Sequence, residues 1–311
     1  MTEPLYDEEE RDRPRPAAAG PVKVRVPAKI NLHLGVGPLR SDGYHELTTV
    51  YHAVSLFDEL TARRGDTLVL TMDGEGAGEL ALDETNLVLR AARALASHTG
   101  MPPHARLHLR KQIPLAAGLA GGSADAAAAL VACDALWGTG LSREELASVA
   151  AELGSDVPFF LGLGRAVGTG RGERLRALTS GGGLALVLVN PNFPLSTAEV
   201  YGRVPAGWRG AAKGTAEMVD ALRGRSVRRV AAALTNTLEG LVEPAVPAIG
   251  RMKAALLAAG ALGAVMSGSG PTVFGVARSL DHAQSIRRRV NRAGWSCWAV
   301  RSLSGPAIRA R

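Results

Sequence analysis

The sequence predicts an α+β protein of two domains. Strand-like runs, in which apolar residues alternate or stand together, recur between helical stretches in both halves of the chain. The segment 179–183, Thr-Ser-Gly-Gly-Gly, has the composition of a linker. A chain of 311 residues is long enough to build two cores. We therefore predict a tail over 1–20, a first domain over 21–179 and a second domain over 180–311.

The composition is that of an ordinary soluble protein. Apolar residues make up 46% and charged residues 21% of the chain. No apolar run reaches the length of a membrane span, and residues 1–20 lack the apolar segment of a signal peptide. Cys133 and Cys297 are too far apart for a metal motif and too few for a disulfide framework. We expect a cytoplasmic protein that does not bind a membrane.

Charge is unevenly distributed along the chain. Residues 1–20 contain six acidic residues and three arginines, a composition typical of disorder, whereas the whole chain has a net charge of +7 and a pI near 9.9. The basic body suits small phosphorylated substrates or a nucleic acid. Charge alone does not choose between these two classes of partner.

The first domain begins with an interrupted strand. Residues 22–26 alternate as a strand, Pro-Ala-Lys-Ile-Asn at 27–31 interrupts them, and the alternation resumes as far as residue 36. Lys29 therefore lies at a break from which a side chain can be directed into a site; a solvated surface lysine is the alternative. Further elements expected before residue 112 are a turn at Asp42-Gly43, a β-rich run over 47–60, a strand over 67–72, a helix over 86–98 and a strand over 105–111.

Two ring side chains follow the turn. Tyr44 and His45 are suited to stacking on a ring and hydrogen-bonding to it, and packing at a strand edge is the alternative. His45 and His52 are not accompanied by a cluster of carboxylates or cysteines that would complete a metal site. Metal coordination by these histidines is therefore not expected.

The strongest local signal is a glycine-rich loop before a helix. Pro114–Asp125 reads Pro-Leu-Ala-Ala-Gly-Leu-Ala-Gly-Gly-Ser-Ala-Asp, and a helix is expected from Ser123 to about Gly138. Glycines let a ligand approach the backbone, and the first amides of a helix have no partner within it. Together with the helix dipole these features favour a phosphate over the alternative, a plain capped turn. The spacing fits neither a Walker A loop nor GxGxxG.

A single aspartate marks the next candidate position. Ser142 and Glu145 form a capping-box pattern for a helix that stops at Gly154. Asp156 follows, ahead of the apolar run Val-Pro-Phe-Phe, and we expect it to be partly buried. On local grounds a helix cap is favoured for Asp156, and a catalytic carboxylate is the alternative. Short strands are expected over 165–170 and 173–178.

The second domain has the alternation of an α+β sandwich. A glycine-rich turn, 263–275, contains Ser-Gly-Ser-Gly-Pro between two strand-like runs. The other expected elements are strands over 184–189 and 296–301 and helices over 197–203, 215–223, 226–240, 247–259 and 279–293.

Three segments together resemble a known family. Pro27–Asn31, the loop 114–125 and Ser267–Pro271 have the order and spacing of the three motifs of the galactokinase, homoserine kinase, mevalonate kinase and phosphomevalonate kinase (GHMP) superfamily. The additional segments Asp42–His45 and Gly154–Phe159 resemble those of the 4-diphosphocytidyl-2-C-methyl-D-erythritol kinases. The resemblance extends from about residue 22 to about 303.

The resemblance implies a fold and a reaction. The fold would be an N-terminal ATP-binding α/β domain and a C-terminal ferredoxin-like α+β domain, with the active site in the cleft between them. The reaction would transfer the γ-phosphoryl group of ATP to the 2-hydroxyl of 4-diphosphocytidyl-2-C-methyl-D-erythritol, in the non-mevalonate isoprenoid pathway. ATP and Mg²⁺ would be required. The protein would be a monomer or a homodimer without a nucleic-acid partner.

The resemblance also implies site residues. Lys29 and Asp156 correspond to the catalytic lysine and aspartate of the family, and Ser123 is the side chain nearest to a magnesium ion held mainly by phosphates. The substrate-binding positions are Asn31, Tyr44, His45 and, on a looser alignment, Tyr201. The ATP-binding loop comprises Pro114, Leu115, Ala116, Ala117, Gly118, Leu119, Ala120, Gly121, Gly122, Ser123 and Ala124.

The loop departs from the family pattern at several positions. Ala116, Ala117 and Ala120 replace glycines, and Ala124-Asp125 replaces the usual Ser-Asn. We expect the alanines to adopt only ordinary backbone angles, so that the close amide contacts come from the remaining loop glycines. Those glycines are Gly118, Gly121 and Gly122.

Three other functions compete with this interpretation. A sister kinase acting on homoserine or mevalonate is disfavoured by the Asp-Gly-Tyr-His segment at 42–45. A basic RNA-binding module agrees with the charge, but aromatic residues are few and basic residues are not clustered. An inactive nucleotide-binding scaffold is disfavoured because Lys29 and Asp156 are both present.

Overall fold

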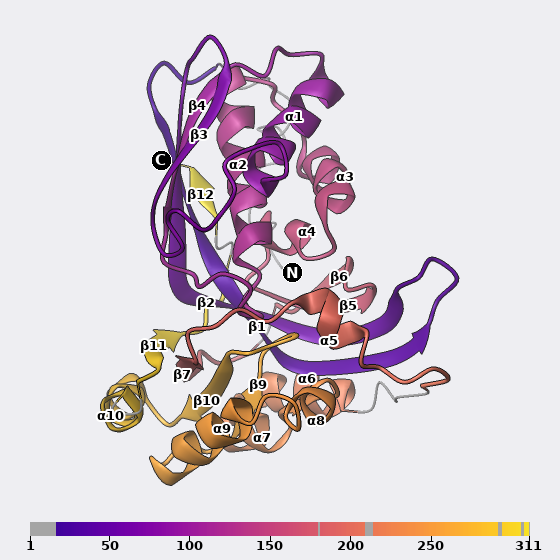
Figure 1. The fold of residues 1–311 in the computed structure, drawn as a ribbon, viewed down its shortest axis with the longest axis vertical. Coiled ribbons are helices and arrows are strands. Elements are labelled where there is room, and N and C mark those ends of the chain that lie inside the picture. The colour runs from indigo at the N-terminus through magenta and orange to yellow at the C-terminus, as the bar shows by residue number, and fades with distance from the viewer. Residues whose placement is uncertain (1–16, 180, 209–213, 292–293, 306–307, 311) are drawn as a thin grey trace, which may run out of the picture.

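The structure is built on two β-sheets. The computed structural model describes residues 17–179, 181–208, 214–291, 294–305 and 308–310 (Figure 1). The strands are β1 Val22–Leu39, β2 His45–Arg63, β3 Leu68–Gly74, β4 Ala105–Lys111, β5 Arg165–Gly170, β6 Arg174–Ala177, β7 Ala185–Asn190, β8 Thr235–Asn236, β9 Ala264–Met266, β10 Val273–Ala277, β11 Ser296–Arg301 and β12 Arg309–Ala310. The helices are α1 Leu87–Thr99, α2 Gly121–Trp137, α3 Arg143–Leu153, α4 Val157–Phe160, α5 Thr197–Tyr201, α6 Thr215–Arg223, α7 Val227–Ala232, α8 Glu239–Val242, α9 Ala248–Ala258 and α10 Leu280–Val290.

The long antiparallel pair β1–β2 is the spine of the first sheet. The strand order is β12-β1-β2-β4-β3, with β3 and β4 parallel, and β5 and β6 extend the sheet from the first part of β2. In Figure 1 the pair runs from the upper half of the molecule across to the hairpin tip at the right of the lower half. A side chain near the middle of β1 therefore lies where the two halves of the molecule meet.

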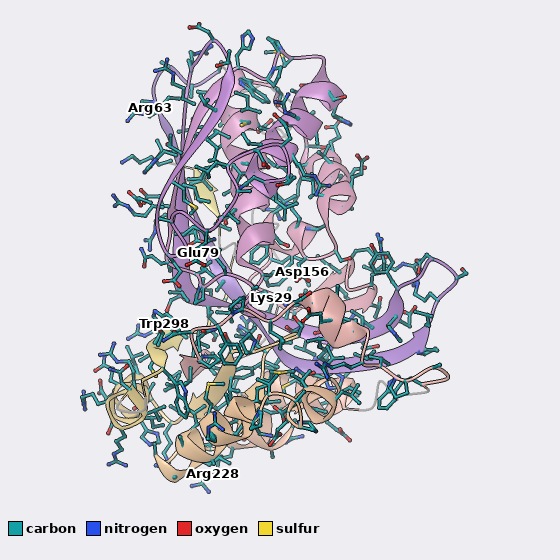
Figure 2. The ribbon with its side chains drawn as sticks, in the orientation of Figure 1. Lys29, Arg63, Glu79, Asp156, Arg228 and Trp298 are labelled. Carbon is teal, nitrogen blue, oxygen red and sulfur yellow. The ribbon has the colours of Figure 1, made fainter. Side chains whose placement is uncertain are left out.

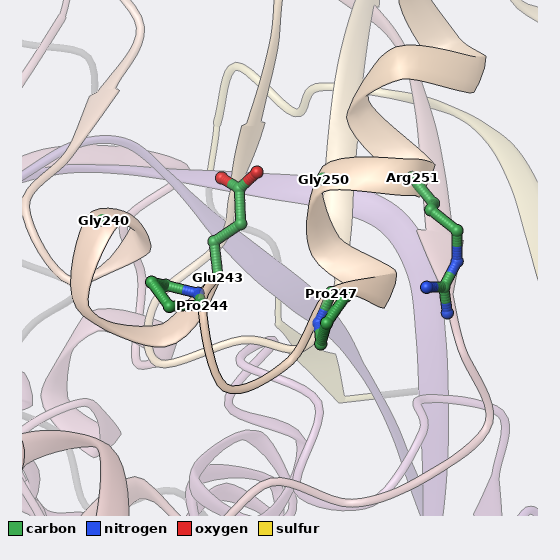
Figure 3. Close-up of a pocket in the computed structure, with 6 residues that line it drawn as sticks. All are labelled: Gly240, Glu243, Pro244, Pro247, Gly250 and Arg251. Atoms are coloured by element: carbon green, nitrogen blue, oxygen red, sulfur yellow. The ribbon is translucent and has the colours of Figure 1, made fainter.

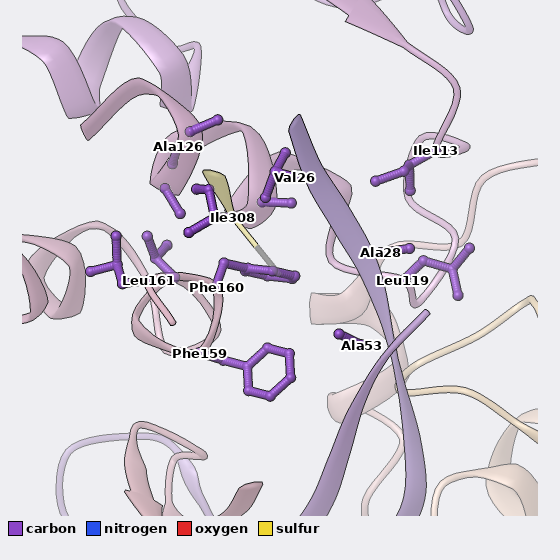
Figure 4. Close-up of a cluster of buried hydrophobic side chains, with 14 of the residues drawn as sticks. Val26, Ala28, Ala53, Ile113, Leu119, Ala126, Phe159, Phe160, Leu161 and Ile308 are labelled. Carbon is purple, nitrogen blue, oxygen red and sulfur yellow. The ribbon is translucent and has the colours of Figure 1, made fainter. Parts of the chain in front are cut away.

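Helix α2 is the centre of the upper half. Its residues Ala126–Leu130 are buried, and apolar side chains surround it because α2 packs on β1 and β2 as well as on α1, α3 and α4. Small alanine side chains allow these elements to approach one another closely. The core continues to the sheet through Val26 and Ile113, and Phe159 and Phe160 close it below α2 (Figure 4).

The second sheet lies in the lower half of Figure 1. Its strand order, β11-β7-β10-β9, is that of an antiparallel ferredoxin-like sheet, with all three neighbouring pairs antiparallel. A second core lies between this sheet and helices α9 and α10; Met252, Leu256 and Ile286 are buried in it. The predicted α+β fold is thus confirmed, including the ferredoxin-like second sheet.

Two predicted elements differ in the structure. The expected interruption at 27–31 is not a break, because β1 is continuous; the irregularity appears as register shifts between Pro27 and Ala28 and between Asn31 and His33. The helix expected over 226–240 is divided into α7, β8 and α8. Thr235 and Asn236 are weak helix formers, and pairing of β8 with β1 outweighs the helical tendency of their neighbours.

The domain division stays a prediction. The tail expected over 1–20 falls outside the described residues as far as residue 16, and Ala18 donates its amide to the carbonyl oxygen of Ala135 on α2 (2.9 Å). Residue 180, within the predicted linker 179–183, lies outside the described residues. Strands β8 and β12, from the later part of the chain, both pair with β1. The second half therefore contributes strands to the first sheet.

Candidate active site

Lys29 and Asp156 meet at the junction of the two halves (Figure 2). Lys29 Nζ lies 3.3 Å from Asp156 Oδ2, although the two residues are far apart in the sequence. The Lys29 side chain is 6% exposed and that of Asp156 is 28% exposed, so the pair is open to a ligand on the aspartate side. Asp156 precedes α4 but its side chain makes no capping hydrogen bond. Asp156 thus occupies the N-cap position expected on local grounds, but its side chain contacts Tyr51 and Lys29 and does not cap the helix.

Neighbouring side chains hold both members of the pair. Tyr51 donates its hydroxyl to Asp156 Oδ1 (2.9 Å), and Lys29 Nζ donates to Asn31 Oδ1 (2.9 Å). The Tyr51 ring packs on Phe159, with ring centroids 5.2 Å apart. Burial, and then the negative charge of Asp156, raise the pKa of Tyr51 well above its ordinary value. Tyr51 therefore remains a proton donor to the carboxylate.

Tyr51 was not identified from the sequence. It lies opposite Asn31 in the β1–β2 register. The signal that could have found it is the hairpin itself, since pairing across the turn at Asp42-Gly43 brings the middle of one strand against the middle of the other. The strand register could not be predicted from the sequence, because the register shifts along β1 change which residues of β1 and β2 pair.

The third glycine-rich segment joins the first two through Ser267. The amide of Asn31 donates to Ser267 Oγ (3.4 Å), and Ser267 Oγ donates to the carbonyl oxygen of Gly118 (3.0 Å). Asn31 Nδ2 also donates to Thr49 Oγ1 (2.7 Å), which fixes the orientation of its amide. All three predicted motifs therefore meet in one place.

The glycine-rich loop is fitted closely against its surroundings. The amide of Lys29 donates to the carbonyl oxygen of Leu119 (3.1 Å), and Thr272 donates its amide to the carbonyl oxygen of Ala117 (3.3 Å). Gly118 has φ +73°, and a Cβ there would stand 2.2 Å from the carbonyl oxygen of Ser267. Only glycine fits at this position.

Two loop alanines correct the expectation about backbone angles. Ala116 has φ 45° and Ala120 has φ 55°, both in the left-handed region. This conformation costs an alanine about 1 kcal/mol or more, so other contacts must enforce it. The carbonyl oxygen of Ala116 accepts from the Leu195 amide (3.2 Å), and that of Ala120 accepts from the Ala124 amide (2.9 Å). These alanines adopt a conformation that glycine adopts more easily.

The N-terminus of α2 leaves amides available for an anion. The helix begins at Gly121, two residues before the predicted start, and Ala120 is its N-cap residue without a side-chain cap. Because Ala124 donates the first bond within the helix, the amides of Gly121, Gly122 and Ser123 have no acceptor inside it. The dipole of this long helix adds a partial positive charge at the same end. The free backbone amides on which the phosphate-binding prediction depends are therefore present at this end of α2.

The predicted ring-binding residues lie around the β1–β2 hairpin. The rings of His45 and Tyr201 stand 6.1 Å apart at a tilt of 31°, so the loosely aligned Tyr201 does reach the predicted group. Burial, followed by the charge of Asp156, raises the pKa of Tyr201.

Tyr44 is 53% exposed, and the Arg171 guanidinium stacks 4.9 Å from its ring centroid. His45 Nδ1 donates to the carbonyl oxygen of Gly37 (2.9 Å), which leaves Nε2 free to accept a hydrogen bond when the ring is neutral.

A buried group of charges lies behind the loop and was not identified from the sequence. Lys111 is hydrogen-bonded to Asp58 and Asp125, and all three side chains are almost fully buried. Burial opposes the positive charge of Lys111, but the two carboxylates outweigh it and its pKa is raised. Burial raises the pKa of Asp125 to about 8 against the opposing effect of Lys111.

The described residues offer little for a metal ion on their own. Among them there is no group of three or more His, Cys, Asp or Glu residues able to hold one.

A pocket between α8 and α9, lined by residues that include Glu243 and Arg251, lies outside the group of residues around Lys29 (Figure 3). Within the described part of the chain, no helix is both long and apolar enough to cross a membrane.

Comparison with known proteins reveals relatives over most of the chain. The family pattern described as GHMP kinases N terminal domain matches residues 86–164, and that described as GHMP kinases C terminal matches residues 218–296. A protein of Salinispora tropica named 4-diphosphocytidyl-2-C-methyl-D-erythritol kinase is 57% identical over 295 residues, which cover 93% of each chain. One of Streptomyces coelicolor with the same name is 47% identical over 292 residues, or 92% of this chain and 97% of the relative.

Solved structures agree with these matches. A crystal structure of 4-(cytidine 5'-diphospho)-2C-methyl-D-erythritol kinase is 35% identical, with a TM-score of 0.76, and the match covers 90% of this chain and 98% of the other. A homoserine kinase from Cytophaga hutchinsonii has a TM-score of 0.75 at 20% identity, covering 95% of this chain and 99% of the other, and so shares the fold.

Proposed function

This chain belongs to the GHMP kinases and, within them, to the 4-diphosphocytidyl-2-C-methyl-D-erythritol kinases, and we propose that its Lys29–Asp156 pair is the catalytic centre. The chain is an ATP-dependent kinase of a small molecule. It transfers the γ-phosphoryl group of ATP to the 2-hydroxyl of 4-diphosphocytidyl-2-C-methyl-D-erythritol and gives the 2-phosphate and ADP. The observation that carries the site proposal is the 3.3 Å contact of Lys29 with Asp156 beside the glycine-rich loop.

Asp156 accepts the proton of the attacking hydroxyl. Its carboxylate is partly exposed, and Tyr51 and Lys29 engage one oxygen each, which fixes its orientation. Transition states for phosphoryl transfer are loose, so the alcohol needs little activation and positioning dominates. The proton is therefore transferred late, when bonding to phosphorus has made the hydroxyl more acidic. Lys29 orients the hydroxyl and offsets negative charge on the transferring group.

The loop Pro114–Ala124 binds the triphosphate of ATP. Support comes from the amides of Gly121, Gly122 and Ser123, which have no acceptor within α2, and from the dipole of that helix. The amide bond from Lys29 to Leu119 joins this loop to the catalytic strand. Binding of ATP and placement of the lysine are therefore coupled through β1.

A magnesium ion fits this site only as a partner of the nucleotide. Ser123, in the first turn of α2, is the side chain that would lie nearest to it, and the remaining ligands would be phosphate oxygens and water. Bound in this way, the ion would neutralise charge on the β- and γ-phosphates.

The ring of the substrate binds beside the hairpin. Tyr44 presents an exposed aromatic face, His45 offers Nε2 as an acceptor, and Tyr201 packs near His45. Asn31 completes the site on the side of Lys29. An exocyclic amino group of cytosine is a donor that matches the acceptor on His45, whereas uracil presents a carbonyl oxygen there. The monomeric or homodimeric state, and the cytoplasmic location, stay predictions.

A coupled assay of ADP release tests the activity. The purified chain is supplied with Mg²⁺, ATP and, separately, the cytidine-diphosphate substrate, homoserine and mevalonate. ADP formation with the first alone, together with a product phosphorylated at the 2-hydroxyl by phosphorus NMR, is the expected result. Turnover of homoserine or mevalonate at a comparable kcat/KM would contradict the proposal.

A further inference from the structure

Three ionisable side chains meet in the core behind the glycine-rich loop. Lys111 Nζ donates to Asp58 Oδ2 (2.7 Å) and to Asp125 Oδ2 (2.6 Å). The three side chains are 1%, 0% and 3% exposed, respectively. They come from different elements: Asp58 from β2, Lys111 from the end of β4, and Asp125 from the second turn of α2. The cluster therefore joins two strands and a helix in the interior.

The cluster holds both ends of the loop. On the entry side, Asp58 Oδ1 accepts the amides of Gln112 (2.6 Å) and Ile113 (2.9 Å), the residues directly before the loop. On the exit side, Asp125 belongs to the helix that the loop leads into, and Lys111 connects the two carboxylates.

Close packing leaves little freedom between the lysine and the helix. A Cβ added at Gly121, the first residue of α2, would stand 3.3 Å from Lys111 Nζ. The ammonium group of Lys111 therefore lies close against Gly121, the residue at which the loop becomes a helix. A displacement of the lysine would displace this turn.

Stability alone does not account for such a cluster. Removing three ionisable groups from water is costly, and apolar side chains of similar volume often stabilise a core at least as well. Asp125 Oδ1 is buried and has no hydrogen-bond partner, so the arrangement is not even fully satisfied. Hydrogen bonds to charged groups, however, fix distances and directions between elements more closely than apolar contacts do.

We propose that Lys111, Asp58 and Asp125 are positioning residues that fix the two ends of the loop and so aim the amides of Gly121–Ser123 at the triphosphate. The proposal rests on the ATP-binding role of the loop proposed above. In the described structure, none of the three side chains is hydrogen-bonded or ion-paired to Lys29 or Asp156. Loss of the cluster should therefore weaken the use of ATP and leave the binding of the second substrate nearly unchanged.

Two substitutions at one position separate charge from hydrogen bonding. In Asp125→Asn an amide oxygen still accepts from Lys111, so we expect the KM and Kd for ATP to stay within about two-fold of the wild-type values. In Asp125→Leu the exit-side contact is lost, and we expect both to rise about ten-fold or more, because small displacements of binding groups are costly. The KM for the cytidine-diphosphate substrate should change less than two-fold in both variants. Asp73→Leu, which removes a carboxylate from the exposed ion pair between Asp73 on β3 and Arg110 on β4, is the control.

A second variant replaces Asp125→Leu in the test if that variant does not fold. If Asp125→Leu does not fold, Lys111→Met combined with Asp125→Leu removes both groups and leaves Asp58 with its two amide donors. Folding is checked by thermal unfolding, and ATP binding by titration calorimetry. The same ten-fold rise confined to ATP supports the proposal. Equal rises for both substrates, or unchanged constants with only a lower Tm, would overturn it.

The two proposals fail differently. A wild-type chain that neither binds ATP nor releases ADP would contradict the proposed function. A wild-type chain that binds ATP, with Asp125→Leu binding it equally well, would contradict only the role of the cluster.

Discussion

The two carboxylate oxygens of Asp156 have different partners: Oδ1 accepts the Tyr51 hydroxyl at 2.9 Å, and Oδ2 lies 3.3 Å from Lys29 Nζ. Tyr51 is itself held by the Phe159 ring, which follows Asp156 by three residues. The aspartate is thus oriented before any substrate arrives, with its partly exposed side directed to a ligand. The first two predictions depend on this arrangement.

Asp156→Asn should lower kcat by about 10²–10⁴-fold, the usual contribution of a general base. The amide keeps the shape of the side chain and can still accept from Tyr51, so the KM for either substrate should change little. Steady-state kinetics of ADP release measures both quantities. Asp73→Asn, on the exposed face of β3, is the control. Near-normal turnover of Asp156→Asn would rule out Asp156 as the general base.

Tyr51→Phe should lower kcat by roughly ten-fold while keeping the fold. The substitution removes one hydrogen bond to a charged group, worth about 1.5–3 kcal/mol, and preserves the ring that packs on Phe159. Part of this energy orients the carboxylate for proton transfer. We expect a Tm close to that of the wild type, measured by thermal unfolding. A reduced Tm with unchanged kcat would indicate that Tyr51 only stabilises the fold.

Much of the site could be predicted because its residues lie in motifs that are local in sequence. The loop, the capping box at Ser142 and the strand that carries Lys29 all follow from short patterns. Tyr51 and Lys111 were missed because their partners are distant in the chain, and strand register decides which side chains meet.

Other errors also have physical causes. A segment predicted as helix contains β8, because pairing with β1 outweighs local propensity. Ala116 and Ala120 are left-handed because contacts made by the loop override the preference of alanine.

Ala120→Gly and Gly118→Ala should have opposite consequences for stability. Ala120 has φ 55°, so glycine relieves strain there, and the free energy of unfolding should be unchanged or rise by up to about 1 kcal/mol. Gly118→Ala places a Cβ 2.2 Å from a carbonyl oxygen and should cost at least ~2 kcal/mol. Chemical denaturation measures both. Ala94→Gly, in the interior of α1, is the control for an ordinary helical position and should cost about 1 kcal/mol. A large loss of stability in Ala120→Gly would contradict this account of the loop.

Tyr44→Ala should weaken the binding of the cytidine substrate. Tyr44 presents its ring at the hairpin with Arg171 stacked on it, and base stacking on an aromatic ring is worth about 1–3 kcal/mol. We expect the KM for the cytidine substrate to rise about ten-fold and the KM for ATP to stay constant. Assays with the cytidine and uridine forms of the substrate give the preference directly. An unchanged preference and an unchanged KM would place the ring of the substrate elsewhere.

His52 should make the fold less stable as the pH falls below neutrality. Burial, and then the charge of Arg165, lower the pKa of His52 from 6.5 to about 3. Between pH 6.5 and 3 the unfolded chain therefore binds a proton that the folded chain excludes, so the free energy of unfolding decreases as the pH decreases, by up to about 1.4 kcal/mol per pH unit.

His52→Leu should remove most of this slope between pH 6 and pH 5, measured by urea unfolding at each pH. The remaining slope of the same sign includes His33, whose pKa burial also lowers. His98→Leu, a substitution of the same kind at an exposed position in the last turn of α1, is the control. A slope that is unchanged in His52→Leu would mean that His52 takes up its proton without unfolding, and that water reaches a ring which the structure shows as 1% exposed.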